Sequence, residues 1–221
     1  VHDGLPCMDN DEYRRGSKTT HAVYGEGMAV LAGDALLNLA FETASSAFSR
    51  TKNEEELRRA ARAMQILSAK SGIGGMVGGQ CADTQAEEFP PEKVTQELLL
   101  YIHENKTAAM IQSPMMIGAL LAGADEEKLE ALERIGSKIG LAFQIRDDIL
   151  DLTSSLQELG KQTGSDLKNN KVTYVSLNGM DASEKEVRRL SEEALQELKG
   201  LTENRNEFLE CLVEDLITRK K

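Results

Sequence analysis

Two clusters of acidic side chains stand far apart in this sequence, each of them close to basic residues. The first contains Asp3 and Asp9, with a pair of arginines after it. The second contains three carboxylates, Asp147, Asp148 and Asp151. Carboxylates in apolar surroundings need a cation, and Mg²⁺ takes oxygen ligands from carboxylates and phosphates. The two clusters therefore predict divalent metal ions that hold a phosphorylated ligand.

The carboxylates of the second cluster share one face of a predicted helix. Gln144, Asp147, Asp148 and Asp151 fall within an arc of roughly 100°, and apolar residues such as Ile145 occupy much of the rest. Like charges at i and i+4 destabilise a bare helix, and their burial is costly unless they are paired. A solvated acidic face is the alternative for so short a motif, but the apolar flanks favour bound Mg²⁺.

The first cluster has a less regular spacing. Asp3 and Asp9 would point to different sides of a helix, but Pro6 interrupts helical hydrogen bonding between them. A bulge or helix end there can bring both carboxylates to one opening. The guanidinium groups of Arg14 and Arg15 are suited to phosphate oxygens. Taken alone, this segment is better explained as a surface loop of mixed charge.

The composition limits the classes of function. The chain has 221 residues and a formal net charge of −11, which argues against a nucleic-acid partner. An acidic protein that binds a polyanion must supply local positive charge through Arg, Lys or metal. The three cysteines are widely spaced, which indicates neither a disulfide framework nor a zinc site, and the three histidines are too scattered for a metal triad. No apolar run approaches the ~20 residues of a membrane span, and no signal peptide is visible.

Helical periodicity runs through most of the chain, and no segment alternates with period two for long enough to form a strand. We expect helices at about 27–48, from 54, at about 92–122 with a kink at Pro114, at 126–152, from about 172, at 183–198 and at about 206–218. Asn53 and Ser183 resemble the starts of capping boxes. The polar stretch 153–170 is expected to be a loop. These elements predict an all-α bundle in one domain, residues 1–221.

Further sequence segments accompany the two acidic clusters. In order, the chain contains HDGLPCMDNDEYRRGSKTTH, GGQCAD, ENKTAAMI, FQIRDDILDL, LGKQTGSD and NNKVTYV. This series resembles the motifs of the trans-polyprenyl diphosphate synthase family, and the resemblance covers essentially the whole chain. It implies the isoprenoid synthase type I fold, a helical bundle around a central active-site cavity. The spacing of the first cluster resembles that of bacterial and plant short-chain enzymes.

The resemblance also implies site residues for a Mg²⁺-dependent prenyl transfer with three Mg²⁺ ions per site. Asp3, Asp9 and Asp147 would be metal ligands, with Asp148 and Asp151 in or near the shell. The allylic diphosphate would be held by Arg14, Lys106 and Lys161. Arg15 would face isopentenyl diphosphate, and Lys171 would close the site. Thr107 and Gln144 would line the path of the allylic cation.

Several of these residues also have plainer explanations. Lys106 can simply extend from an apolar helix to solvent, and Lys161 and Lys171 can be ordinary loop lysines. Gln80 and Asp83 are better explained as a polar pair that packs helices. The glycines between 72 and 79 lack the spacing and the preceding strand of a dinucleotide site, and fit close helix packing instead.

Two departures from the family pattern stand out. The family usually has Asp where this chain has Gly4. The missing carboxylate can weaken metal binding or lower the reaction rate. The N-terminal helices of the family, which bind isopentenyl diphosphate and limit product length, are expected to be missing from this sequence.

The preferred function is a farnesyl diphosphate synthase. A geranylgeranyl diphosphate synthase and a non-catalytic regulatory subunit of a synthase are the alternatives. A class I terpene cyclase shares the fold, but its second motif of Asn/Asp, Ser/Thr and Glu is not found. The expected assembly is a homodimer. The expected compartment is the cytoplasm, or the plastid if a transit peptide has been removed.

Overall fold

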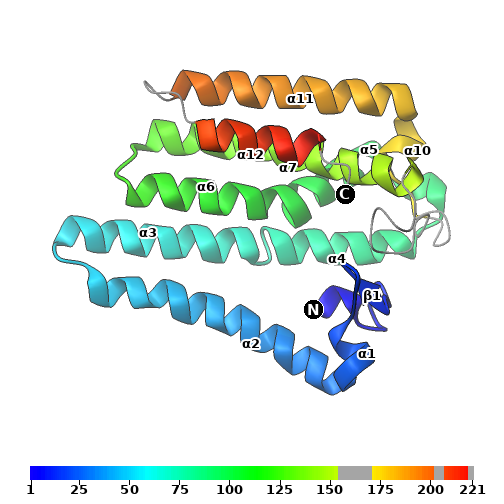
Figure 1. Cartoon of the computed structure of the whole chain (residues 1–221), viewed down its shortest axis with the longest axis horizontal. Coiled ribbons are helices and arrows are strands. Elements are labelled where there is room, and N and C mark those ends of the chain that lie inside the picture. Colours follow the sequence, from blue (N-terminus) through cyan, green and yellow to red (C-terminus); the bar gives the residue numbers. More distant parts are fainter. Residues whose placement is uncertain (154–170, 202–206, 219–221) are drawn as a thin grey trace.

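The computed structural model describes residues 1–153, 171–201 and 207–218. Its long helices run side by side in a layered bundle (Figure 1). From one edge of the bundle to the other, the layers are α11 (Met180–Leu201), α7 (Glu126–Thr153), α6 (Ala109–Leu121), α3 (Glu54–Ser71) and α2 (Glu26–Ser45), with α12 (Glu207–Thr218) packed on α11 and α7. The predicted all-α architecture is therefore observed in the described residues.

The core is built around α7, whose apolar residues recur at helical spacing. Ile135, Ile139 and Ile145 are each at most 1% exposed and pack towards Val187 and Leu190 of α11. A smaller cluster on the α3 and α6 side contains Ile66, Met116, Leu120 and Leu129. Since α7 is buried on two sides, its carboxylates are held on a helix that cannot easily move.

Shorter elements connect the layers. They are η1 (His2–Gly4), β1 (Tyr13–Arg14), β2 (Ser17–Lys18), α1 (Thr20–Tyr24), η2 (Ser46–Arg50), α4 (Met76–Glu87), η3 (Pro91–Lys93), α5 (Gln96–Ile102), η4 (His103–Ala108) and α10 (Tyr174–Asn178). β1 and β2 pair as an antiparallel hairpin. Each strand has only two residues, which is too short for a period-two pattern to be recognised in the sequence. None of the described helices has the combined length and hydropathy that a bilayer crossing requires.

The two expected capping sites have different outcomes. The Asn53 side chain accepts a hydrogen bond from the Glu56 backbone N–H at 2.9 Å, so the predicted start of α3 is confirmed. The prediction that Ser183 caps the start of a helix is wrong, because α11 already begins at Met180. The Ser183 hydroxyl instead donates to the Gly179 carbonyl at 2.8 Å, a bond made within the first turns of the helix.

The predicted helix at 92–122 is observed as three consecutive helical segments. α5 ends at Ile102, a π-helical turn η4 covers His103–Ala108, and α6 continues from Ala109. Pro114 lies inside α6, which runs on to Leu121. The irregular segment is therefore the π turn, and π turns are frequent at functional sites.

Candidate active site

A cavity of about 240 Å³ lies where the N-terminal segment faces α4, η4, α7 and residues 171–173. Residues from both acidic clusters line it together. Of the site residues expected from the sequence, the lining contains Asp3, Asp9, Arg14, Lys106, Thr107, Gln144, Asp147, Asp148, Asp151 and Lys171. Lys161 lies outside the described residues. The lining also contains residues that were not among the expected site residues, and Asp83, Glu87 and His103 are the ones that matter below.

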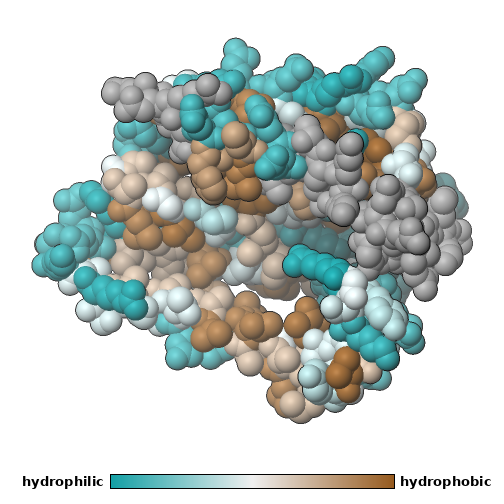
Figure 2. Space-filling view, in the orientation of Figure 1, coloured by the Kyte–Doolittle hydropathy of each residue, from teal (hydrophilic) through white to brown (hydrophobic). Residues whose placement is uncertain are grey.

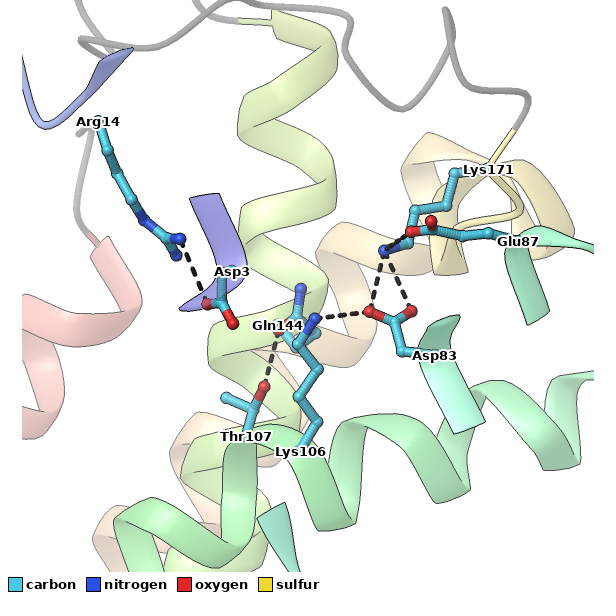
Figure 3. Close-up of polar contacts among 8 residues, drawn as sticks. All are labelled: Asp3, Arg14, Asp83, Glu87, Lys106, Thr107, Gln144 and Lys171. Carbon is cyan, nitrogen blue, oxygen red and sulfur yellow. Dashed lines mark hydrogen bonds and ion pairs between the residues drawn. The ribbon is translucent and has the colours of Figure 1, made fainter. Parts of the chain in front are cut away.

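The first acidic cluster is brought to the cavity by an irregular turn. η1 ends at Gly4, and the Asp9 backbone N–H donates to the Asp3 carbonyl at 2.8 Å. The interpretation that a helix end brings both carboxylates to one opening is therefore consistent with the lining. Arg14 donates to Asp3 Oδ2 at 3.2 Å (Figure 3). The Asp9 pKa is raised by partial burial and by Asp3 and Asp11, against the opposing effect of Lys106 and Lys171.

Arg15 is placed differently from Arg14. It occupies the turn between β1 and β2, where it is exposed and has a φ of 53°, next to Gly16 with a φ of 76°. It is not part of the cavity lining. The expected contact of Arg15 with isopentenyl diphosphate thus stays a prediction.

The second acidic cluster projects from one face of α7, as predicted. Asp148 Oδ2 accepts a hydrogen bond from the Tyr174 backbone N–H at 2.8 Å, which ties α10 to α7. Asp151 is 5% exposed, and within the described part of the chain neither of its carboxylate oxygens has a hydrogen-bond partner. Buried carboxylate oxygens without partners are costly, so this site is suited to a cation.

The donor set fits Mg²⁺ better than a transition metal, because it consists of carboxylate oxygens. Within the described residues, no three acidic, His or Cys side chains are already close enough to hold one ion between them. The two acidic clusters line a shared cavity but do not form a preassembled metal cage. Ligands from the substrate would complete the shell, which is the usual arrangement for Mg²⁺.

The π turn η4 presents two neighbouring residues, Lys106 and Thr107, to the cavity. Figure 3 shows both side chains pointing into it from the same turn. The Thr107 hydroxyl donates to Gln144 Oε1 of α7 at 2.9 Å. Its lone pairs remain available to face a positive charge, because its only hydrogen is committed to Gln144.

Partly buried polar contacts and a close helix approach hold the π turn in place. Glu104 accepts from Gln112 Nε2 at 2.7 Å and from Ser137 Oγ at 2.5 Å, and Gln112 in turn accepts from Lys70 at 2.5 Å. On the other side, a Cβ atom built on Gly79 of α4 would lie 2.1 Å from the Lys106 backbone nitrogen. The predicted close packing of this glycine segment is therefore observed at the site itself.

The two cavity lysines share one buried carboxylate. Lys106 Nζ donates to Asp83 Oδ2 at 2.5 Å, and Lys171 Nζ lies 3.0 Å from Asp83 Oδ1 (Figure 3). Burial alone would raise the Asp83 pKa, but the Lys171 and Lys106 charges outweigh it and hold the pKa below its usual value. The expected pairing of Asp83 with Gln80 is thus replaced by ion pairs to residues distant in sequence.

His103 is another lining residue that was not among the expected site residues. It begins the π turn, is 4% exposed, and its Nδ1 has no hydrogen-bond partner among the described residues. Burial lowers its pKa to about 4, with an opposing contribution from Asp83. The imidazole is therefore neutral at physiological pH and adds no charge to the lysine pair.

A family model described as polyprenyl synthetase matches residues 1–212. Geranylgeranyl pyrophosphate synthase 3, chloroplastic, of Arabidopsis thaliana is 45% identical over 200 residues, which are 90% of this chain and 55% of that protein. The heterodimeric geranylgeranyl pyrophosphate synthase large subunit 2 of the same plant is 40% identical over 221 residues, 100% of this chain and 57% of the relative. The chain thus spans little more than half the length of these relatives.

A solved structure gives a matching fold. A geranyltransferase from Helicobacter pylori, complexed with magnesium and isoprenyl diphosphate, superposes with a TM-score of 0.81 at 37% identity. The match covers 98% of this chain and 68% of the bacterial one.

Proposed function

The chain belongs to the polyprenyl synthetase family, and we propose that it acts in a short-chain trans-prenyl transferase that condenses isopentenyl diphosphate with an allylic diphosphate. One observation carries this proposal. The carboxylates of two distant acidic clusters line the same cavity as a pair of lysines, and Asp151 has two buried oxygens that a cation would satisfy. This is a site for a metal-bound polyanion.

In this proposal Asp3, Asp9, Asp147 and Asp151 would hold Mg²⁺, with Asp148 beside them. Mg²⁺ held there would supply positive charge against the negative charge of the diphosphate group. The expected number of three ions per site comes from the family resemblance.

The remaining side chains act on the substrate directly. Lys106, Lys171 and Arg14 donate hydrogen bonds to diphosphate oxygens from the cavity wall. Thr107 directs its oxygen lone pairs, and Gln144 its amide dipole, towards the allylic carbon that becomes positive. Diphosphate leaves the allylic carbon, the double bond of isopentenyl diphosphate attacks that carbon, and the resulting cation passes a proton to the released diphosphate anion, which completes the condensation.

We propose geranylgeranyl diphosphate as the main product. The sequence alone favoured farnesyl diphosphate, but both plant relatives above are named for geranylgeranyl diphosphate. Farnesyl diphosphate synthesis is retained as the alternative product.

The test is a Mg²⁺-dependent condensation assay with isopentenyl diphosphate and C5, C10 or C15 allylic partners, followed by sizing of the products. A C20 end product supports the proposal, whereas a product that stops at C15 supports the farnesyl alternative. No product with any partner, together with no Mg²⁺-dependent binding of inorganic diphosphate, would contradict the enzyme function altogether.

A non-catalytic regulatory subunit is the second candidate, and Gly4 is the observation that favours it. Gly4 is buried, and a Cβ there would lie 3.1 Å from Thr19 Cγ2. A missing carboxylate can therefore be restored only if Thr19 gives way slightly. We suggest comparing Gly4→Asp alone with Gly4→Asp combined with Thr19→Ser, which removes the crowding methyl group. Condensation that appears only in these variants supports the regulatory function, and condensation by the original chain rejects it.

A homodimer is proposed from the family resemblance, and the surface of α2 supports it. Only Ala29 of α2 is buried, and large apolar side chains lie exposed along the helix, among them Leu31, Leu36 and Leu39. Figure 2 shows hydrophobic surface along the lower edge of the molecule, where Figure 1 places α2. Light scattering coupled to size exclusion would measure the mass, and a strict monomer at micromolar concentration would contradict the dimer.

The plastid is the proposed compartment, because one of the plant relatives is named as chloroplastic. A fluorescent fusion of the complete gene product would distinguish the plastid from the cytoplasm.

A further inference from the structure

A buried carboxylate in the cavity wall has no role in the proposed chemistry. Asp83 lies on α4, and its side chain is 7% exposed. Its Oδ2 accepts from Lys106 at 2.5 Å and from Lys171 at 3.1 Å, and its Oδ1 lies 3.0 Å from the same Lys171 nitrogen. The two lysines come from sequence positions 23 and 88 residues away. One carboxylate therefore gathers two cations that the chain would otherwise leave apart.

The charges explain why an anion is needed at this position. Since both ammonium groups contact the same oxygen, they lie within about 6 Å of each other and would repel without a shared counter-ion. Among the described residues, Glu87 pairs with Lys171, at 3.3 Å, and not with Lys106, and its side chain is more exposed. Asp83 is thus the residue that makes a close lysine pair possible.

The lysines remain able to bind a ligand while Asp83 holds them. An ammonium group has three N–H donors, so one bond to Asp83 does not by itself prevent a lysine from donating to a ligand as well. Both side chains are about one quarter exposed, at 26% for Lys106 and 27% for Lys171, and both line the cavity. Figure 3 shows the two nitrogens converging on Asp83 from η4 and from residue 171.

Without Asp83 the lysines have other carboxylates to turn to. Both lysines act electrostatically on Asp9, a proposed metal ligand. A lysine released from Asp83 would move towards Asp9. It would then neutralise a carboxylate meant for metal and leave the place where diphosphate oxygens are expected.

We infer that Asp83 is a positioning residue that holds Lys106 and Lys171 together as a preorganised diphosphate-binding pair and keeps them away from the metal-binding carboxylates. The inference rests on the proposed function, because it assumes that the cavity binds diphosphate. It adds a residue that touches neither substrate nor metal and acts only through the two lysines.

The test is calorimetric titration of the full chain with inorganic diphosphate in excess Mg²⁺. Asp83→Asn keeps the size of the side chain and removes its charge, and we expect binding to weaken by roughly tenfold to a hundredfold. Asp83→Glu, which restores the charge, is expected to recover most of the affinity. Asp125→Asn is the matched control, because Asp125 pairs with Lys128 at the far end of the bundle and its loss leaves binding unchanged.

The sign of the change separates positioning from simple charge removal. Deleting a negative charge near a polyanion site should by itself strengthen diphosphate binding. Equal or tighter binding by Asp83→Asn, with wild-type binding intact, therefore overturns the inference and leaves the proposed function standing. Failure of the wild-type chain to bind diphosphate with Mg²⁺ instead contradicts the proposed function, and the inference with it.

A second variant covers the case in which Asp83→Asn does not fold, as judged by circular dichroism. Glu87→Gln removes the partly exposed partner of Lys171 alone, and we expect about threefold weaker binding. In addition, Asp83→Asn placed on a Lys171→Met background should weaken binding less than it does alone, because one of its two partners is already gone. Undiminished binding by Glu87→Gln, or fully additive effects in the double variant, would count against Asp83 acting through the lysines.

Discussion

Gly79 is the point where α4 touches the backbone of the π turn, and its replacement by alanine should reveal how tightly this turn is held. The added Cβ would lie 2.1 Å from the Lys106 nitrogen and 2.7 Å from the Asn105 carbonyl carbon. Ordinary contact begins near 3.4 Å, so α4 and η4 must separate by about 1.3 Å. Backbone atoms cannot rotate away as a flexible side chain would. The separation therefore has to come from displacing a helix.

The energetic effect combines two opposing contributions. Overpacking of this kind costs up to about 3 kcal/mol, and alanine regains about 1 kcal/mol of helix propensity over glycine. The expected net loss is about 2 kcal/mol, which corresponds to a fall in Tm of roughly 4–8 °C for a chain of this size. The same displacement would stretch the Lys106–Asp83 bond, because Asp83 lies one helical turn after Gly79.

Gly118 of α6 provides a control with the same substitution. A Cβ at Gly118 meets nothing within 4 Å, so Gly118→Ala should stabilise the chain by about 1 kcal/mol through helix propensity alone. The free energy of unfolding is measured by urea titration with circular dichroism. If Gly79→Ala is as stable as wild type, or moves in the same direction as Gly118→Ala, then the close approach of α4 to the π turn is wrong.

Three further predictions concern buried polar groups of the bundle. Because burial lowers the His103 pKa from 6.5 to about 4, the unfolded chain binds the extra proton between these values. Stability should then fall as the pH drops from 6.5 to 4, by on the order of 3 kcal/mol, and urea titrations of His103→Gln should lack this part of the pH dependence. Asp151→Asn should stabilise the metal-free chain by about 1–3 kcal/mol, since it removes a buried charge that has no hydrogen-bond partner among the described residues. It should also abolish the rise in Tm that we expect Mg²⁺ to give the wild type; destabilisation of the metal-free chain would be inconsistent with this. Gln112→Leu should cost about 1–3 kcal/mol in chemical unfolding because it leaves Lys70 and Glu104 without their shared partner, and a neutral result would show that the polar chain across the bundle adds no stability.

Local features of the sequence were sufficient to predict much of the architecture. Apolar residues at helical spacing predicted α7 to within one residue of its observed end, and Asn53 marked the start of α3. The same periodicity placed the acidic residues of the second cluster on one face. These predictions succeed because helix formation and capping depend on residues a few positions apart.

The π turn could not be predicted in this way. The segment 103–108 has the composition of an ordinary helix, and Pro114 was the more obvious place for an irregularity. The turn is stabilised by Glu104, which accepts hydrogen bonds from two other helical residues, and by Gly79, which lets α4 approach. Neither contact leaves a signal in the local pattern, because both depend on residues brought together by packing.

The sequence by itself determined the helical class, the acidic face of α7 and, through resemblance, most residues of the cavity. The tertiary structure alone decided how they are used. It placed Arg15 outside the cavity lining, left Asp151 buried with no hydrogen-bond partner among the described residues, and made Asp83 the shared counter-ion of Lys106 and Lys171. The physical reason is that desolvation and ion pairing depend on distances across the folded chain, and residues far apart in sequence acquire those distances only when the helices pack.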